Sequence, residues 1–246
     1  MVSSGIEFNG HNSSEFGLYV SASDFTLVTP ERDLTMTDVA GVDGSIICDN
    51  DAFKSVIQPF HLIGVKPNRL TDAISLKRNL SSWLKPPKAY RPLHFSGLPG
   101  YYWEAICYES EIYTRTNKNM SDVQLSFSCK PFLKSDVGQN KIVLPGEIVN
   151  ELINEEDWPA EPLFHVVGSG NMVLTINGDG FQLNGVDEEV WVDSENQQVY
   201  KSLEQNRSTI AVFPNHEFPK LKPGKNNIGV IGAASVEIIP NWRTLA

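Results

Sequence analysis

Most of this chain has the pattern of short strands and turns, and some of its segments alternate polar and apolar residues with a period of two. The clearest case is 121–129 (SDVQLSFSC), where one face carries Val123, Leu125, Phe127 and Cys129 and the other carries Gln124, Ser126 and Ser128. This alternation predicts an antiparallel strand that is buried on one face. Near the start of the chain, Ile6 and Phe8, and then Leu18 and Val20, are expected to face inward in two short strands. The pattern therefore predicts a mainly β protein.

One segment, Arg69–Lys85, follows the helical period instead. Apart from Lys77, the residues at its three- and four-residue spacings are apolar, namely Leu70, Ala73, Ile74, Leu80, Trp83 and Leu84. Thr71 is expected to cap the N-terminus, Asp72 suits its positive end, and Pro86-Pro87 prevents continuation. We expect this helix to cover one open face of the β-structure in the first half of the chain.

The region between Asp24 and Pro67 combines turn and strand signals. FTLV, TPERD and LTMTDVAG predict a strand, a turn and a second strand, and Gly41 and Gly44 predict a tight bend. Asp49–Asp51 is predicted to form another turn. The strand that follows is interrupted by Pro59, which has no N–H to donate. Such a strand is either a plain sheet edge or an arm that pairs with a neighbouring copy.

The second half is rich in turns. Residues 137–162 are interpreted as a linker plus a first strand, and from Leu163 seven or eight short strands follow at near-regular spacing. This spacing predicts a sandwich or jelly roll. Asn177–Gly180 could suggest a Ca²⁺ loop, but NGDG between two strands is first a hairpin turn. The chain is divided into domains 1–136 and 137–246.

Charge is distributed unevenly along the chain. The formal net charge is −10, and residues 137–246 contain 15 acidic residues but only seven basic ones. Between Lys141 and Lys201 there are twelve carboxylates and no Lys or Arg. A surface that grips nucleic acid needs the opposite sign, so sequence-specific nucleic-acid binding is not expected. No run of 18 apolar residues occurs, so no membrane partner is expected.

Residues that could bind a metal or perform catalysis are scattered. Cys48, Cys107 and Cys129 are widely spaced, without a CxxC pair, and are interpreted as buried reduced thiols. The histidines form neither HxH nor HExxH. We therefore expect no metal, no cofactor and no catalytic residue. The chain is not expected to be an enzyme.

Two carboxylate triplets and a set of aromatic residues leave alternatives open. Glu155-Glu156-Asp157 and Asp187-Glu188-Glu189 could suggest a glycosidase, but three adjacent acids are usually a solvated rim. Aromatic residues could form sugar-stacking platforms, although they more often fill cores or anchor interfaces; they are Tyr101, Tyr102, Trp103, Trp158 and Trp191. The alternative function is therefore a carbohydrate-binding module that recognises a cell-wall polysaccharide.

Several segments in a fixed order resemble the distal tail protein (Dit) family of phages with long, non-contractile tails. In the second half these are FHVVGSGNMVLTING, VWVDSENQQVYK, FPKLKPGKNNIGV and VEIIPNWRTL. In the first half they are IEFNG, FGLYV, VDGSI, the amphipathic helix and FSCKPFL. The resemblance covers nearly the whole chain. It implies an N-terminal β-sandwich with one packed helix and a galectin-like or carbohydrate-module-like C-terminal sandwich.

The resemblance also implies a structural function. Such proteins form a ring, usually a hexamer, at the distal end of the tail, where they join the tail tube, the tape-measure protein, the tail-associated lysin and receptor-binding or baseplate proteins. An inter-subunit belt would map onto Asp24–Pro67, with contact candidates Phe53, Val56, Ile57, Pro59 and Phe60. The two carboxylate triplets are candidates for a surface that faces partner proteins.

The expected location is the virion tail tip, after assembly in the host cytoplasm. The N-terminus has neither a basic start nor an apolar region, so Sec-type secretion is not expected. DNA would pass through the ring without adhering, so the lumen should be acidic or neutral.

Overall fold

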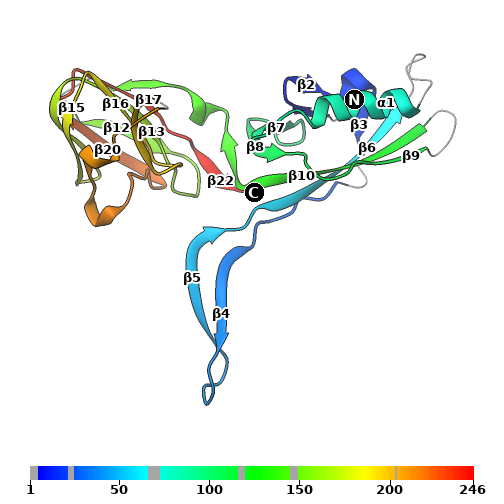
Figure 1. Ribbon diagram of the computed structural model, residues 1–246, viewed down its shortest axis with the longest axis horizontal. Coiled ribbons are helices and arrows are strands. Elements are labelled where there is room, and N and C mark those ends of the chain that lie inside the picture. Colours follow the sequence, from blue (N-terminus) through cyan, green and yellow to red (C-terminus); the bar gives the residue numbers. More distant parts are fainter. Residues whose placement is uncertain (1–4, 22–24, 66–72, 116–119, 145–148, 203) are drawn as a thin grey trace. The chain divides into compact units, whose positions relative to one another are not determined.

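A computed structural model shows a mainly β protein with one α-helix among the described residues (Figure 1). It describes residues 5–21, 25–65, 73–115, 120–144, 149–202 and 204–246. The chain divides into two compact units. Unit 1 is Met1–Leu133 with Leu245–Ala246, and unit 2 is Lys134–Thr244. The sequence placed the boundary after residue 136, and it did not predict that the last two residues return to unit 1.

Unit 1 is built on one large sheet. Its strands run in the order β2-β1-β7-β8-β10-β6-β3, and β9 and β22 also pair with β10. The bounds are β1 Ile6–Phe8, β2 His11–Asn12, β3 Leu18–Val20, β6 Val56–Val65, β7 Arg91–Phe95, β8 Tyr101–Ile106, β9 Ile112–Arg115, β10 Met120–Ser135 and β22 Arg243–Leu245. A short 3₁₀ helix, η1 (Ser13–Phe16), joins β2 to β3. The predicted alternation in β10 is confirmed, because Val123, Leu125, Phe127 and Cys129 are all buried.

The helix α1 (Ala73–Leu84) packs on the core of unit 1. Leu76, Leu80, Trp83 and Leu84 form its buried stripe. Leu76 was not among the predicted stripe residues, and Lys77, the exception in the predicted stripe, is exposed. The indole N–H of Trp83 donates to the carbonyl of Phe8 at 2.7 Å. Residues 66–72, which include the predicted helix start, Leu70, Thr71 and Asp72, lie outside the described residues.

Pro59 lies on a partly open strand edge. β6 pairs with β10 along its whole length, whereas β3 pairs only with Leu62–Gly64, so no described strand pairs with Pro59 on the β3 side. The predicted FTLV strand (25–28) is wrong, because the segment is irregular in the structure. The buried Gln58 side chain provides the reason. It accepts from the Val28 N–H at 3.1 Å and donates to the Thr26 carbonyl at 2.5 Å, in place of strand pairing.

Unit 2 is a sandwich of two antiparallel sheets. The strand orders are β11-β21-β13-β16-β17-β18 and β12-β20-β14-β15-β19. The bounds are β11 Ile142–Leu144, β12 Asn150–Asn154, β13 Leu163–Val167, β14 Gly170–Ile176, β15 Asp179–Val186, β16 Glu189–Asp193, β17 Gln198–Ser202, β18 Gln205–Asn206, β19 Ala211–Val212, β20 Gly224–Ile231 and β21 Ser235–Ile239. Three 3₁₀ helices complete it: η2 Val137–Gln139, η3 Ser208–Ile210 and η4 Pro214–His216. Phe164 and Val192 of the first sheet meet Leu174 and Leu183 of the second in one core. The predicted fold class is confirmed.

The N-terminal part of unit 2 corrects the predicted linker. Residues 137–162 contain η2, β11 and β12, and these two strands belong to different sheets of the sandwich. The predicted hairpin turn at 177–180 is confirmed in the tight turn between β14 and β15, where Asn177 and Gly178 both have positive φ. No helix within the described ranges is long and apolar enough to span a bilayer.

Candidate functional site: an exposed β-hairpin

The most unusual element of unit 1 is a hairpin that pairs with no other described strand. It consists of β4 (Arg32–Asp38) and β5 (Ser45–Phe53), which form their own two-stranded sheet (Figure 1). We call residues 32–53 the arm. Gly41 and Gly44, with φ of 84° and 82°, turn the chain at its tip as predicted. An isolated two-stranded hairpin is at best marginally stable in water.

Apolar side chains occupy both faces of the arm. Met36 lies opposite Ile47 on one face, and Thr37 lies opposite Ile46 on the other. Large fractions of these apolar side chains are exposed: 62% of Met36, 59% of Ile47 and 49% of Ile46. Val39 and Val42 are also exposed at the tip. A contiguous exposed apolar surface of this kind is typical of an interaction site.

The base of the arm is anchored. Arg32 donates to Asp49 across the two strands at 2.7 Å, and its guanidinium lies 5.5 Å from the ring centroid of Phe53. The Lys54 N–H donates to the Glu31 carbonyl at 2.9 Å and closes the ribbon. The ring of Phe53 packs edge-on against Phe132 of β10, with centroids 5.7 Å apart. These contacts fix where the arm leaves unit 1.

The predicted turn at Asp49–Asp51 is wrong, because these residues lie within β5. The register between the strands shifts near the base, Asp51 has a φ of 51°, and its N–H donates to the Asp49 side chain at 3.0 Å. This is a local irregularity in the strand of the kind that bends a ribbon. The residues predicted to form a turn do form a local irregularity, but the strand continues through them.

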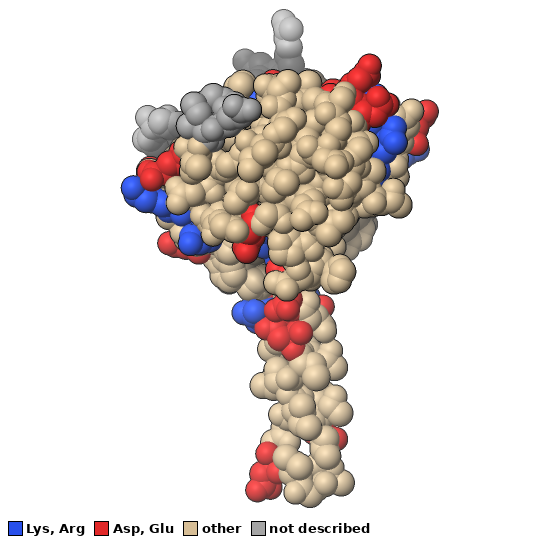
Figure 2. All heavy atoms as spheres, turned by 90° about the vertical axis from the view of Figure 1, so that its left-hand side faces the viewer, with Lys and Arg blue, Asp and Glu red and all other residues tan. Residues whose placement is uncertain are grey.

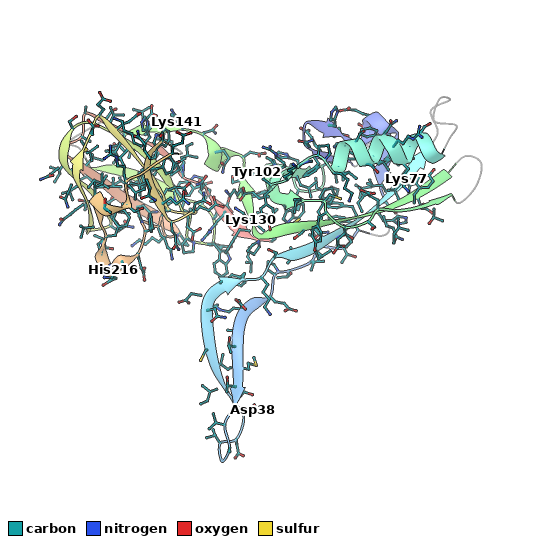
Figure 3. The ribbon with its side chains drawn as sticks, in the orientation of Figure 1. Asp38, Lys77, Tyr102, Lys130, Lys141 and His216 are labelled. Atoms are coloured by element: carbon teal, nitrogen blue, oxygen red, sulfur yellow. The ribbon has the colours of Figure 1, made fainter. Side chains whose placement is uncertain are left out.

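Charge on the arm has one sign beyond its base. Residues 33–53 contain five carboxylates and no Lys or Arg. Figure 2 shows the arm as a mostly uncharged column, with acidic side chains near its base and tip. Asp38, near the tip in Figure 3, accepts from the Ser45 hydroxyl at 2.6 Å. The arm is therefore apolar along its faces and negative overall.

The five predicted belt residues fall into two groups. Val56 and Phe60 are buried in the core of unit 1, so the prediction that they contact another subunit is corrected. Ile57 and Pro59 alternate with them along β6 and are exposed. Phe53 is half-buried at the arm base. Sequence reasoning missed the arm residues Met36, Ile46 and Ile47. The adjacent isoleucines in SIIC carried the signal, because they place apolar groups on both faces of one strand.

The two carboxylate triplets lie in connections to different sheets. Glu155-Glu156-Asp157 follows β12, whereas Asp187-Glu188-Glu189 leads into β16. The second triplet is largely paired. Lys201 Nζ lies 3.3 Å from Asp187 and 3.0 Å from Glu188, and Glu189 contacts His165 at 2.8 Å. A partner-facing role for these six residues remains a prediction.

An aromatic row crosses the six-stranded sheet of unit 2. His165, Trp191 and Tyr200 are neighbours on β13, β16 and β17. The His165 and Trp191 rings stack at 4.0 Å, and Tyr200 lies parallel to Trp191 with centroids 6.4 Å apart. Beside them, Glu237 accepts from Lys141, and this contact, followed by that with His165, lowers the pKa of Glu237.

One ring face in this row is closed to a sugar. A sugar stacks on an open ring face, and His165 covers one face of Trp191 at contact distance. Trp103 and Tyr102 are buried, and Tyr101 and Trp158 are half-buried. The aromatic residues therefore give no support to the carbohydrate-binding alternative.

The three cysteines differ in exposure. Cys107 and Cys129 are buried and free, as predicted, but Cys48 is exposed on the arm, which corrects its prediction as a buried thiol. Burial raises the pKa of Cys107 to about 11 and that of Cys129 to about 12. No group of three potential metal ligands is present in the described part of the chain.

Comparison with known proteins rests on structure. No family profile matches the chain, and no curated protein matches its sequence. Among solved structures, it is similar to the crystal structure of the Dit protein (gp 19.1) of SPP1, described as a paradigm of the hub adsorption apparatus in phages that infect Gram-positive bacteria. The TM-score is 0.71 at 14% identity, over 96% of this chain and 97% of that one. The chain has the Dit fold.

Proposed function

We propose that this chain is a structural protein of a phage tail, which forms a ring at the tail tip and acts as a hub for other tail proteins. One observation carries the proposal: an anchored, exposed arm with apolar side chains on both faces. The Dit fold, matched over nearly the whole chain, supports the same function. The arm would bind the neighbouring copy, and the expected number of copies is six.

The hub would join the tail tube, the tape-measure protein, the tail-associated lysin and receptor-binding or baseplate proteins. It would assemble in the host cytoplasm and remain in the virion. Its function would rest on geometry rather than on chemistry, so we propose no enzymatic activity. The lumen should be acidic or neutral, because DNA must pass through without adhering.

Oligomeric state and virion content test the proposal together. Native mass spectrometry and negative-stain images of the purified protein, over a range of concentrations, should show a closed ring. Mass spectrometry of virions from the genome that encodes this chain should detect it. A protein that is absent from virions, or that hydrolyses glycans or peptidoglycan, would contradict the proposal.

A matched pair of variants connects the ring to the arm. Ile47→Asp places a charge on the arm, and Ile231→Asp places one at a similarly exposed position in unit 2, since the exposed fractions are 59% and 64%. Both variants should remain folded. Only Ile47→Asp should lose the ring, because a carboxylate buried in an interface is costly. Equal ring formation by both variants would exclude the arm from the contact.

A further inference from the structure

A segment rich in cations begins within α1 and continues beyond its C-terminal end. Between Asp72 and Glu104 the chain has no carboxylate, but it has five basic residues, Lys77, Arg78, Lys85, Lys88 and Arg91. Lys85 pairs with Glu111 at 2.8 Å. The other four are exposed and form no ion pair with any described residue. We call residues 77–91 the cationic segment.

The arm carries the complementary charge. It presents five carboxylates and no cation beyond Arg32, and Asp43 near its tip is exposed. Opposite charges on two exposed surfaces of one chain can satisfy each other within one copy or between two copies. The arrangement of unit 1 decides between these cases.

The two surfaces lie on opposite faces of the unit 1 sheet. α1 packs on the core side, where Trp83 and Phe127 belong to one cluster. The arm is anchored on the other side, because Phe53 packs on Phe132, which alternates with the buried residues of β10. Figure 3 shows Lys77 on α1 and Asp38 near the far end of the arm. An arm anchored on the outer face is directed away from α1 of its own copy.

We infer that the arm of one copy docks on the cationic segment of the next copy. This inference rests on the proposed ring. The contact joins two different surfaces, so it is head-to-tail, and contacts of this kind close into rings when the rotation allows it. Arm carboxylates would face Lys77 and Arg78, while Met36 or Ile46 lose their exposure. The contact would also cover cations that could otherwise hold DNA.

Zero-length cross-linking tests the contact directly. A carbodiimide joins a carboxylate to an amine in contact, and trypsin releases the arm as one peptide, 33–54, because Arg32 and Lys54 flank it. In a mixture of ¹⁴N- and ¹⁵N-labelled protein, this peptide should be linked to Lys77 or Lys88 in light–heavy pairs. The exposed Lys222 of unit 2 is the control and should not be linked.

Charge reversal provides the second test. Asp38→Lys with Asp43→Lys should weaken self-association by at least about tenfold, and so should Lys77→Glu with Arg78→Glu. Combining the four changes should restore it. Asp43→Lys alone, which leaves the Asp38–Ser45 contact intact, guards against a misfolded arm. Glu155→Lys with Asp157→Lys, at exposed positions of unit 2, is the matched control and should change nothing.

The outcomes separate this inference from the proposed function. Rings that form normally but lack the link, or reversals that are not rescued by combination, would overturn the docking and leave the ring intact. A link between copies together with rescue supports it. If DNA binds the cationic segment of assembled rings, the segment is open, and the docking is wrong. A wild-type protein that never assembles and is absent from virions would overturn both proposals.

Discussion

Two hairpins of this chain share an arrangement of residues but have opposite surroundings. The arm and the β14–β15 hairpin both carry apolar residues on two strands joined by a glycine turn. In unit 2, Leu174 is 2% exposed and Leu183 is 1% exposed. On the arm, Ile47 is 59% exposed. A β-hairpin of this composition is stable where a second sheet covers it, and this contrast is the reason we propose that the arm forms half of an interface.

The largest expected difference concerns core truncation. Leu174→Ala should destabilise unit 2 by about 2–5 kcal/mol, because it leaves a cavity between the two sheets. Ile47→Ala should change the free energy of unfolding of the monomer by less than about 0.5 kcal/mol. Urea denaturation measures both. A large loss of monomer stability in Ile47→Ala would show that the arm is packed within its own copy.

A second contrast concerns the thiols of the arm and of the core. Burial raises the pKa of Cys129 from 9.0 to about 12, so the folded protein keeps a proton that the unfolded chain loses. Stability should therefore be full below about pH 9 and fall between about pH 9 and 12, by on the order of 4 kcal/mol. Denaturation across that range should show a smaller fall in Cys129→Ala.

The exposed thiol supplies the control for that contrast. Cys48 on the arm should react with a thiol reagent in the native protein at pH 8, whereas Cys107 and Cys129 should not. If Cys48 loses its reactivity on ring formation, the arm is covered. Labelling of Cys129 before unfolding would contradict its burial.

The turn glycines offer a smaller, matched test. Gly178 and Gly44 have φ of 99° and 82°, and a Cβ at either would meet open space. Gly178→Ala should cost about 1 kcal/mol through backbone strain in the sandwich. Gly44→Ala carries the same local strain, but global stability should not change, because the arm adds little to it. A comparable fall in melting temperature for both variants would contradict this difference.

The smallest effect is expected at the arm base. Arg32→Met removes the pair with Asp49, in which both side chains are more than a third exposed. Global stability should change by less than about 0.5 kcal/mol. Hydrogen exchange of the arm amides should nonetheless become faster, because the base is less restrained. Unchanged exchange would show that the Phe53–Phe132 and Lys54–Glu31 contacts anchor the arm without this pair.

The sequence determined much of the architecture on its own. Strict alternation in 121–129 predicted a half-buried strand, and the helical spacing around Leu80 and Trp83 predicted the helix. These predictions hold because the periods of strand and helix translate directly into one buried face. The turn at Asn177-Gly178 follows from local chemistry in the same way. The resemblance of ordered segments to the Dit family anticipated a fold that now rests on a structural match.

Tertiary structure decided which apolar residues are covered. Val56 and Phe60 were predicted to contact another subunit but lie in the core, whereas Ile46 and Ile47 are exposed. The period of the apolar pattern cannot distinguish buried from exposed apolar residues, because burial depends on which strand lies alongside. The Gln58 side chain bonds the backbone of residues 25–28, which pair with no described strand. β5 continues through the turn predicted at Asp49–Asp51. In both places long-range contacts outweigh local preference. The arm was found only when strand pairing showed that no described strand lies beside it.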